Sequence, residues 1–394
     1  MLTVYLDSQD YSRLSNLRAL RQDPALQAVL DGFKFWQKSS KVRFVFSDVV
    51  VGEMLPLDAF SVSDAVERMR LLRDLCGDNA LVPWSALATK EVRCLHSRNC
   101  PNKSEFFSQK FWTPELGHIF PISPDAPALD QIIEEGLRAK GYDRSARRRV
   151  MPGLLRKAFQ NRVMEMKAKL SSGIIHLSPE GEIAALQWAA GEIDVKQANE
   201  RVILSFQDAE WLASTAKYDM KLISIFQKGI REPARTAATA MLNFINNIAA
   251  NRAGSNVDSK KKSALDRVSW ESLRRQIIAS NIEGVAEYCG LEVDNDLSVD
   301  IIRKFCPGQY VMHSALHSSV GDSIFGNRKS EPDSNQYTDA MHASYAPYVD
   351  IFRADKFMSP HIRSQLIENG TVVVRLLADV NKAIEDKLKT FEGA

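Results

Sequence analysis

The chain lacks an excess of charge of either sign. Among its 394 residues, 51 are Lys or Arg and 49 are Asp or Glu, so the formal net charge is only +2. This balance argues against a uniformly cationic coat for nucleic acid, and any basic binding surface has to be local. With 45% hydrophobic and 25% charged residues, the composition also argues against global disorder.

Cysteine is scarce and poorly spaced for structural roles. Five cysteines in a chain of this length do not form a disulfide framework. The only close pair is Cys94 and Cys100, and its spacing differs from the Cys-x-x-Cys of a structural zinc site. We therefore expect reduced thiols that bind no metal.

Long apolar runs are missing as well. No stretch approaches the ~18 uninterrupted apolar residues of a membrane helix, and we expect no membrane partner. The sequence starts with the apolar run 2–6 and Asp7, without a basic segment and an apolar leader before them. We expect a cytoplasmic protein, and a homo-oligomer is compatible with the sequence.

The two ends of the sequence alternate between strand-like and helix-like patterns. Apolar runs at residues 2–6, 42–48 and 80–84 are separated by segments with apolar residues at helical spacing. Near the C-terminus, strand-like runs at 351–354 and 371–375 resume the alternation. This order predicts an α/β fold, a three-layer α/β/α sandwich with helices on both faces of a parallel sheet.

Between these ends, from Cys94 to Gly326, strand-like runs nearly disappear and helical patterns dominate. The sequence therefore predicts a sheet domain in two parts, residues 1–95 and 327–394. A large, mostly helical insertion, residues 96–326, splits them. A chain of this length accommodates one domain with such an insertion.

Four acidic residues accompany the strand-like runs. Asp7 closes the first run, and Glu53 lies in a short helical segment after the second. Asp339 precedes the C-terminal run 351–354, and Asp355 follows it. Ligands of parallel α/β sheets bind beyond the carboxyl ends of the strands, so we expect these side chains to meet there. Carboxylates so close together repel one another, and a hard divalent cation between them relieves the repulsion.

The surroundings of these acids resemble those of the PIN-domain nucleases. The resemblance rests on Asp7-Ser8 after the first run, on Glu53 after the second, and on the segment from Asp339 to Asp355. It implies a PIN-like α/β/α sandwich whose four acids bind Mg²⁺ or Mn²⁺ and hydrolyse RNA, usually single-stranded. Ser8 stands where this family often has a threonine, and it is a candidate contact of the substrate.

On this basis we predict a metal-dependent nuclease, in the first place an endoribonuclease acting on single-stranded RNA. Phosphodiester hydrolysis needs a hydroxide at neutral pH and compensation of charge on the phosphoryl oxygens, and carboxylate-bound divalent ions supply both. We expect Asp7 and Asp339 to be direct ligands of Mg²⁺ or Mn²⁺. Glu53 and Asp355 are expected to hold metal-bound water or a second ion.

Neighbouring polar residues have other predicted roles. Asn335 and His342 share a helix face with Asp339, because they lie four residues before it and three after it. Asn335 is a candidate contact for metal-bound water or phosphate. His342 is better explained as a packed or hydrogen-bonded histidine, since hard cations prefer oxygen ligands. Asp350 is about 16 Å from Asp355 along the same strand, so we expect it at the opposite end.

One strongly basic segment, residues 140–169, lies in the predicted insertion. Its basic residues include Arg147, Arg148 and Arg149, and only Asp143 and Glu165 oppose them. Such a surface is a candidate for following the phosphate backbone of RNA, with steeply salt-dependent binding. A solvated helix face balanced by acidic neighbours explains the pattern equally well.

Two other classes of protein are compatible with the same residues. Asp7 after a strand is also typical of a phosphatase with an aspartyl nucleophile, but that family has a second Asp where this sequence has Gln9. The other is a non-catalytic nucleic-acid- or protein-binding module on a PIN scaffold, and the complete set of acids argues against it. The resemblance covers residues 1–95 and 330–380, so the choice between RNA and DNA is left open.

Overall fold

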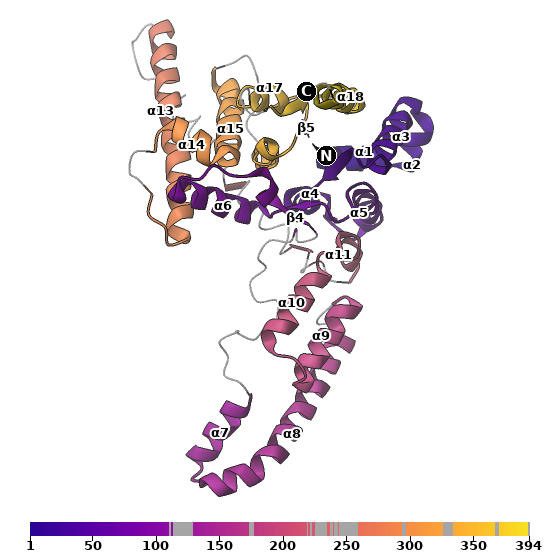
Figure 1. Ribbon diagram of the computed structural model, residues 1–394, viewed down its shortest axis with the longest axis vertical. Coiled ribbons are helices and arrows are strands. Elements are labelled where there is room, and N and C mark those ends of the chain that lie inside the picture. Colours follow the sequence, from indigo (N-terminus) through magenta and orange to yellow (C-terminus); the bar gives the residue numbers. More distant parts are fainter. Residues whose placement is uncertain are drawn as a thin grey trace. The chain divides into compact units, whose positions relative to one another are not determined.

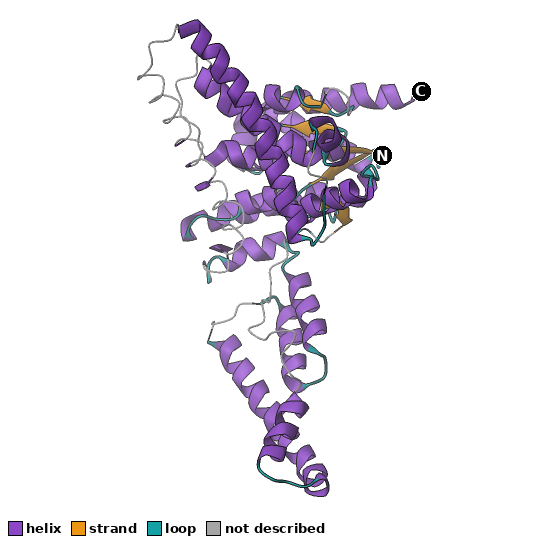
Figure 2. Cartoon of the chain, turned by 90° about the vertical axis from the view of Figure 1, so that its left-hand side faces the viewer, coloured by secondary structure: helices purple, strands orange, loops and turns teal. Residues whose placement is uncertain are grey.

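The computed structural model describes residues 1–109, 129–172, 177–218, 259–293, 297–325, 334–366 and 370–392, with a few single positions between them. The chain divides into two compact units. The first consists of residues 1–114 and 221–394, and the second of residues 115–220. Strands occur only in the first unit among the described residues (Figure 2).

A four-stranded parallel sheet is the centre of the first unit, and its strand order is β2-β1-β5-β6. Its strands are β1 (Leu2–Tyr5), β2 (Val42–Val45), β5 (Ile351–Arg353) and β6 (Val372–Val374). Val4 pairs with Phe44 on one side and with Ile351 on the other. Strands from opposite ends of the sequence therefore lie side by side. The predicted α/β class with a parallel sheet is confirmed.

The inner strands are short apolar runs that are covered on both faces. All three residues of β5 are buried, and in β1 only Thr3 is partly exposed. Burial on both faces is typical of parallel strands between helices. At about 25 cal/mol per Å² of apolar surface, this burial is the main stabilising contribution to the sheet.

The third predicted strand joins the fold in a different way. β3 (Ala80–Leu81) pairs antiparallel with β4 (Phe107–Gln109) in a separate two-stranded sheet. A single isolated parallel bridge connects β3 to Phe46, just beyond β2. Pro83 has no backbone N–H for a ladder, so the strand stops and helix α6 (Trp84–Ser97) begins.

Helices from the N-terminal part surround this sheet (Figure 1). They are α1 (Ser8–Leu14), α2 (Leu17–Gln22), α3 (Pro24–Lys38), α4 (Asp48–Met54), α5 (Val62–Cys76) and α6, with 3₁₀ turns η1 (Ala59–Ser61) and η2 (Lys103–Phe106). Asp23 begins α3 by accepting hydrogen bonds from two backbone N–H groups, and Pro24 occupies the first turn. Both choices suit a helix start, where N–H groups lack intrahelical partners.

The other helices of this unit come from later in the sequence. They are α13 (Ser259–Tyr288), α14 (Val299–Phe305), α15 (Pro307–Phe325), α16 (Ser334–Ala343), α17 (Met358–Arg363) and α18 (Val380–Glu392), with 3₁₀ turns η3 (Ala346–Tyr348) and η4 (Leu377–Asp379). α13, α14 and α15 thus belong to the same compact unit as the sheet. The domain boundaries after residues 95 and 326 stay predictions.

A buried carboxylate joins α6 to α15. Glu91 accepts hydrogen bonds from the backbone N–H groups of Gly308 (2.5 Å) and Gln309 (2.9 Å) and from the Tyr348 hydroxyl. These N–H groups form the first turn of α15, where a negative charge is favourable. Glycine is required at position 308, because a Cβ there would lie 2.4 Å from the Ser344 carbonyl oxygen.

The second unit is helical in its described residues. Its helices are α7 (Leu129–Ala139), α8 (Arg144–Ser171), α9 (Pro179–Ala190), α10 (Val195–Ser205) and α11 (Ala209–Thr215). α9 packs against both α8 and α10, and α8 also contacts α7. In α8 only Met166 is fully buried, so most of this helix faces solvent. In neither unit do the described residues include a helix with the length and apolar character of a membrane span.

Candidate metal centre

Asp7, the first acid of the site, lies between the end of β1 and the start of α1. Asp7 caps α1, and its carboxylate accepts a hydrogen bond from the Gln9 backbone N–H at 3.2 Å. Asp10 completes the capping box by accepting from the Asp7 backbone N–H. This cap fixes the Asp7 carboxylate at the carboxyl end of the strand, where the residue is only 6% exposed.

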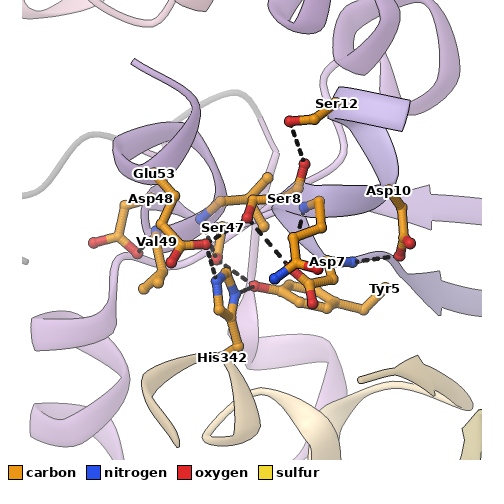
Figure 3. Close-up of polar contacts among 12 residues, drawn as sticks. Tyr5, Asp7, Ser8, Asp10, Ser12, Ser47, Asp48, Val49, Glu53 and His342 are labelled. Carbon is orange, nitrogen blue, oxygen red and sulfur yellow. Dashed lines mark hydrogen bonds and ion pairs between the residues drawn. The ribbon is translucent and has the colours of Figure 1, made fainter. Parts of the chain in front are cut away.

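The second acid is positioned by α4. Ser47 caps this helix by accepting from the Val50 backbone N–H, and Glu53 lies in its last turn. Ser8 lies between the first two acids: its Oγ is 2.6 Å from Glu53 Oε2 and 3.2 Å from Asp7 Oδ1 (Figure 3). The predicted substrate contact Ser8 is thus engaged with the two carboxylates.

His342 of α16 completes this part of the site. Its Nε2 is 2.7 Å from Glu53 Oε2, and its Nδ1 is 2.7 Å from the Tyr5 hydroxyl, which in turn lies 2.7 Å from Ser47 Oγ (Figure 3). Burial acts to lower the pKa of His342, but the Glu53 carboxylate and its neighbours raise it to about 9. The expectation of a hydrogen-bonded histidine is confirmed. Even so, ligand atoms of Asp7, Glu53 and His342 all lie within 4.8 Å of one another.

Asp339 lies one turn before His342 on α16. It interacts electrostatically with the remaining acid, Asp355, and with Asp7 and Glu53. Burial raises the pKa of Asp339 well above its usual value, and the negative charges of Asp7, Asp355 and Glu53 raise it further. Such mutual effects require the groups to lie close together. The structure therefore places Asp7, Glu53 and Asp355 within electrostatic reach of Asp339, and we call these four carboxylates the acidic cluster. Only Asp7 and Glu53 among them belong, with His342, to the group whose ligand atoms lie within 4.8 Å of one another.

Asp355 is the last member of the acidic cluster in the sequence. It follows β5 and is partly exposed. Its Oδ1 accepts a hydrogen bond from the Met358 backbone N–H at 2.5 Å, in the first turn of α17. Like Asp7, it is therefore held by a helix start that follows a strand.

One cation lies beside the acidic cluster and was not predicted from the sequence. Arg353, the last residue of β5, is 6% exposed and lies 3.1 Å from Asp7 Oδ2 and 2.9 Å from Asp10 Oδ1. The contact with Asp10 is a close ion pair without hydrogen-bond geometry, because its Oδ1 has no hydrogen-bond partner among the described residues. Burial raises the pKa of Asp10 to about 7, although the positive charge of Arg353 acts to lower it. A charged residue inside a short buried strand was the signal available in the sequence.

Two other acids lie outside the cluster. Asp350 accepts hydrogen bonds from the backbone N–H and hydroxyl of Thr3 at the amino end of the sheet, as expected for a residue away from the site. Asp48 follows Ser47, which caps α4. The Asp48 carboxylate instead accepts from the Trp84 backbone N–H and the Tyr345 hydroxyl, and burial raises its pKa to about 6.

Of the other predicted substrate contacts, Asn335, Arg148 and Arg149 are exposed, and Arg147 is only partly exposed. Asn335 lies in the first turn of α16 and is exposed. Arg147, Arg148 and Arg149 lie in the second unit, at the start of α8. Arg147 donates to the Tyr142 carbonyl oxygen, whereas Arg148 and Arg149 face solvent.

The donor set of the acidic cluster fits a hard divalent cation. Four carboxylates offer oxygen ligands, which Mg²⁺ and Mn²⁺ prefer, and one imidazole is within reach. Arg353 and the charged form of His342 offset only part of the negative charge. A cation among these side chains would relieve the repulsion that Asp339 experiences.

Comparison with known proteins adds no family to this picture. No family model, no curated protein sequence and no solved structure matches the chain. Function is therefore inferred from the residues of the site.

Proposed function

We propose that this protein is a metal-dependent nuclease with a PIN-like fold, most simply an endoribonuclease acting on single-stranded RNA. The main support is one observation: Asp7, Glu53 and Asp355, from both ends of the sequence, act on the buried Asp339 carboxyl near the carboxyl end of a parallel sheet. This is the position at which α/β sheets bind ligands. The three-layer arrangement, the helical insertion 96–326 and a cytoplasmic location are parts of the same proposal.

In this proposal the acidic cluster holds Mg²⁺ or Mn²⁺, with Asp7 and Asp339 as direct ligands. When bound, such an ion lowers the pKa of a coordinated water and offsets charge on the scissile phosphate. The chain's own residues fix the ligands: Ser8 and His342 both contact Glu53, and Arg353 orients Asp7. Contacts of this kind hold metal ligands in one conformation and tune their basicity.

The exposed face of α8 supports an RNA partner. Arg149, Arg156 and Lys167 are exposed, and separations of seven and eleven residues are close to two and three whole helical turns. The three side chains therefore form one line along the helix. None of them forms an ion pair with another residue that the structure describes. In the proposal this line contacts phosphates of the RNA backbone.

A cleavage assay tests the nuclease proposal. Purified protein is incubated with labelled single-stranded RNA or DNA in Mg²⁺, Mn²⁺ or EDTA, beside Asp339→Asn and the matched control Asp350→Asn. We expect metal-dependent cleavage of RNA that Asp339→Asn abolishes and Asp350→Asn retains. Cleavage that survives both EDTA and Asp339→Asn would contradict the proposal.

The same assay separates the two alternatives. Salt-sensitive RNA binding without cleavage in either metal would favour a binding module, and the four interacting acids argue against this outcome. Hydrolysis of a small phosphomonoester would favour the aspartyl-nucleophile phosphatase. Gln9, at the position of that family's second acid, is exposed on α1.

A further inference from the structure

Beside the acidic cluster lies a cavity of about 490 Å³ between α1, the end of α4 and α5. Ser8 and Glu53 form part of its wall, so the cavity begins at the acidic cluster. Its volume falls within the range of ~300–1,000 Å³ that is typical of small-molecule sites. We propose that this cavity binds one nucleotide of the RNA, adjacent to the phosphodiester that is cleaved. The inference rests on the proposed nuclease function and adds a site for the substrate.

Two arginines give the cavity a positive wall. Arg68 of α5 is half-buried, and its Nη2 donates to the Met54 carbonyl oxygen at 3.0 Å. Its Nε is buried and has no hydrogen-bond partner among the described residues. Arg13, in the last turn of α1, is exposed. Neither guanidinium forms an ion pair with another described residue.

One buried N–H of Arg68 has no acceptor among the described residues, and Arg13 is exposed, so both guanidinium groups can take an anionic partner. Leaving a buried N–H without an acceptor is unfavourable. The one acid of the cavity wall, Glu53, is already engaged by Ser8 and His342. A phosphate group offers oxygen acceptors to the fork of donors in a guanidinium, and it carries the opposite charge. The arginines therefore select an anion such as a nucleotide phosphate.

The rim of the cavity offers apolar surface. Leu57 lines it and is 60% exposed, and Phe60 is 97% exposed immediately before Ser61, another lining residue. The turn that carries Phe60 is fixed by Asp58, whose carboxylate accepts from the Phe60 and Ser61 backbone N–H groups at 3.0 and 2.8 Å. An aromatic ring held in water on a defined turn suits stacking of an unpaired base.

A nucleotide of a single strand matches these features together. Its phosphate suits the two arginines, its base suits the exposed ring, and the next phosphate along the chain would reach the acidic cluster through Glu53. A bare phosphate ion would use only the arginines. This difference separates the proposed ligand from adventitious anion binding.

The diagnostic variants are Arg13→Gln and Phe60→Ala, because both side chains are exposed and their replacement leaves the core intact. Arg70→Gln is the matched control: Arg70 lies on α5, pairs with Glu67 at 2.6 Å and is not part of the cavity wall. Arg68→Gln is a poorer test, since Arg68 also anchors the Met54 carbonyl.

Two readouts are measured for each variant. The first is kcat and KM for cleavage of a fluorescein-labelled single-stranded RNA in Mn²⁺, and the second is anisotropy of the same RNA in EDTA. We expect Arg13→Gln and Phe60→Ala each to raise KM and Kd about tenfold, since a charged contact or a stacked base contributes about 1–3 kcal/mol. Their kcat should stay within about twofold of wild type because neither group touches the scissile phosphate. Arg70→Gln should behave as wild type.

The outcomes separate this inference from the nuclease proposal. If wild type cleaves RNA and the cavity variants match Arg70→Gln, the inference is wrong and the nuclease proposal stands. If wild type cleaves nothing but the cavity variants lose RNA binding, the nuclease proposal fails and the binding site stands. If Arg13→Gln weakens binding and Phe60→Ala does not, the cavity binds phosphate alone and the nucleotide assignment is overturned.

Discussion

Aspartates at the two ends of the parallel sheet have opposite surroundings: hydrogen-bond donors at the amino end and other carboxylates at the carboxyl end. At the amino end, Asp350 accepts from the Thr3 N–H and hydroxyl at 2.9 and 2.8 Å, and Lys103 lies 3.6 Å away. At the carboxyl end of the same strand, Asp355 acts on Asp339, whose pKa is raised. A carboxylate surrounded by hydrogen-bond donors has its charge and its acceptor oxygens compensated by the protein itself. Carboxylates that face one another leave a need for a cation.

In the proposal, the acids at the amino end of the sheet contribute to stability and those at the carboxyl end to metal binding. Burying carboxylates against one another disfavours the folded state, and such an arrangement is typical of functional sites. Substitutions of Asp339 and Asp350, one from each end, should therefore have opposite consequences for stability and activity. Arg353, which neutralises acids at the carboxyl end, is a separate case.

The largest effect on stability is expected at Arg353, the only cation that contacts both Asp7 and Asp10 among the described residues. Arg353→Met should lower the free energy of unfolding by about 3–5 kcal/mol, because two buried acids lose their counter-ion. Urea unfolding in metal-free buffer measures this loss. Arg375→Met, at an exposed position after β6, is the control and should change little. A loss below about 1 kcal/mol would show that Arg353 is not the counter-ion the geometry indicates.

Asp339→Asn should separate activity from stability. We expect RNA cleavage to fall by at least about a hundredfold, the scale on which metal sites lose activity when their groups are changed. The free energy of unfolding without metal should stay the same or rise, since the variant removes a buried group repelled by Asp7 and Glu53. Cleavage kinetics and thermal unfolding of one preparation give both quantities. A marked loss of stability would mean that Asp339 is structural.

Asp350→Asn makes the reverse comparison. An amide cannot reproduce every contact of the carboxylate with Thr3 and Lys103, so the free energy of unfolding should fall by about 1–3 kcal/mol. Cleavage should stay within about twofold of wild type, because the residue lies at the other end of β5 from the acidic cluster. A loss of cleavage as large as that of Asp339→Asn would remove the distinction between the two ends.

Glu91 is a buried acid that is surrounded by hydrogen-bond donors and lies away from both ends of the parallel sheet. Burial raises its pKa from 4.5 to about 7, although Tyr348 and two backbone N–H groups oppose the shift. The folded state therefore binds this proton more tightly than the unfolded state. Its contribution to stability is fully present below pH 4.5 and is lost as the pH rises through about 7.

Glu91→Gln should remove this pH dependence. Between pH 4.5 and about 7, the window set by the two pKa values, wild type should lose stability relative to the variant by up to about 1.4 kcal/mol per pH unit. Urea unfolding of both proteins across this range measures the difference. Parallel curves would show that Glu91 does not titrate in the folded protein.

The smallest effect is expected from the exposed line on α8. Arg149→Gln with Arg156→Gln should reduce the slope of log K against log salt for single-stranded RNA by about 1.4, at ~0.7 for each phosphate contact. Arg138→Gln is the matched control, because Arg138 is already paired with Glu134 at 2.7 Å. Equal slopes for the double variant and the control would mean that α8 is a solvated face.

The pattern of residues that are close in the sequence was enough to predict the strands of the parallel sheet and the acids that follow them. The apolar runs of β1, β2, β5 and β6 and the acids after them could be read from the sequence, because strand formation and helix capping depend on adjacent residues. The antiparallel pairing of β3 with β4 could not be predicted, since β4 is three residues long and lies in a helical region. The partners of His342 were also hidden, because Tyr5 and Glu53 are far from it in sequence.

The sequence by itself determined which segments are strands and helices and which chemical groups stand where they end. Only the tertiary structure decided that β1 lies between β2 and β5, and therefore that Asp7 acts on Asp339, more than 300 residues away. The same packing formed the ion pair between Arg353 and Asp7 and the hydrogen bond from the Thr3 hydroxyl to Asp350. The reason is physical: propensity and capping act between neighbours in the chain, whereas repulsion, ion pairing and desolvation depend on distance in space.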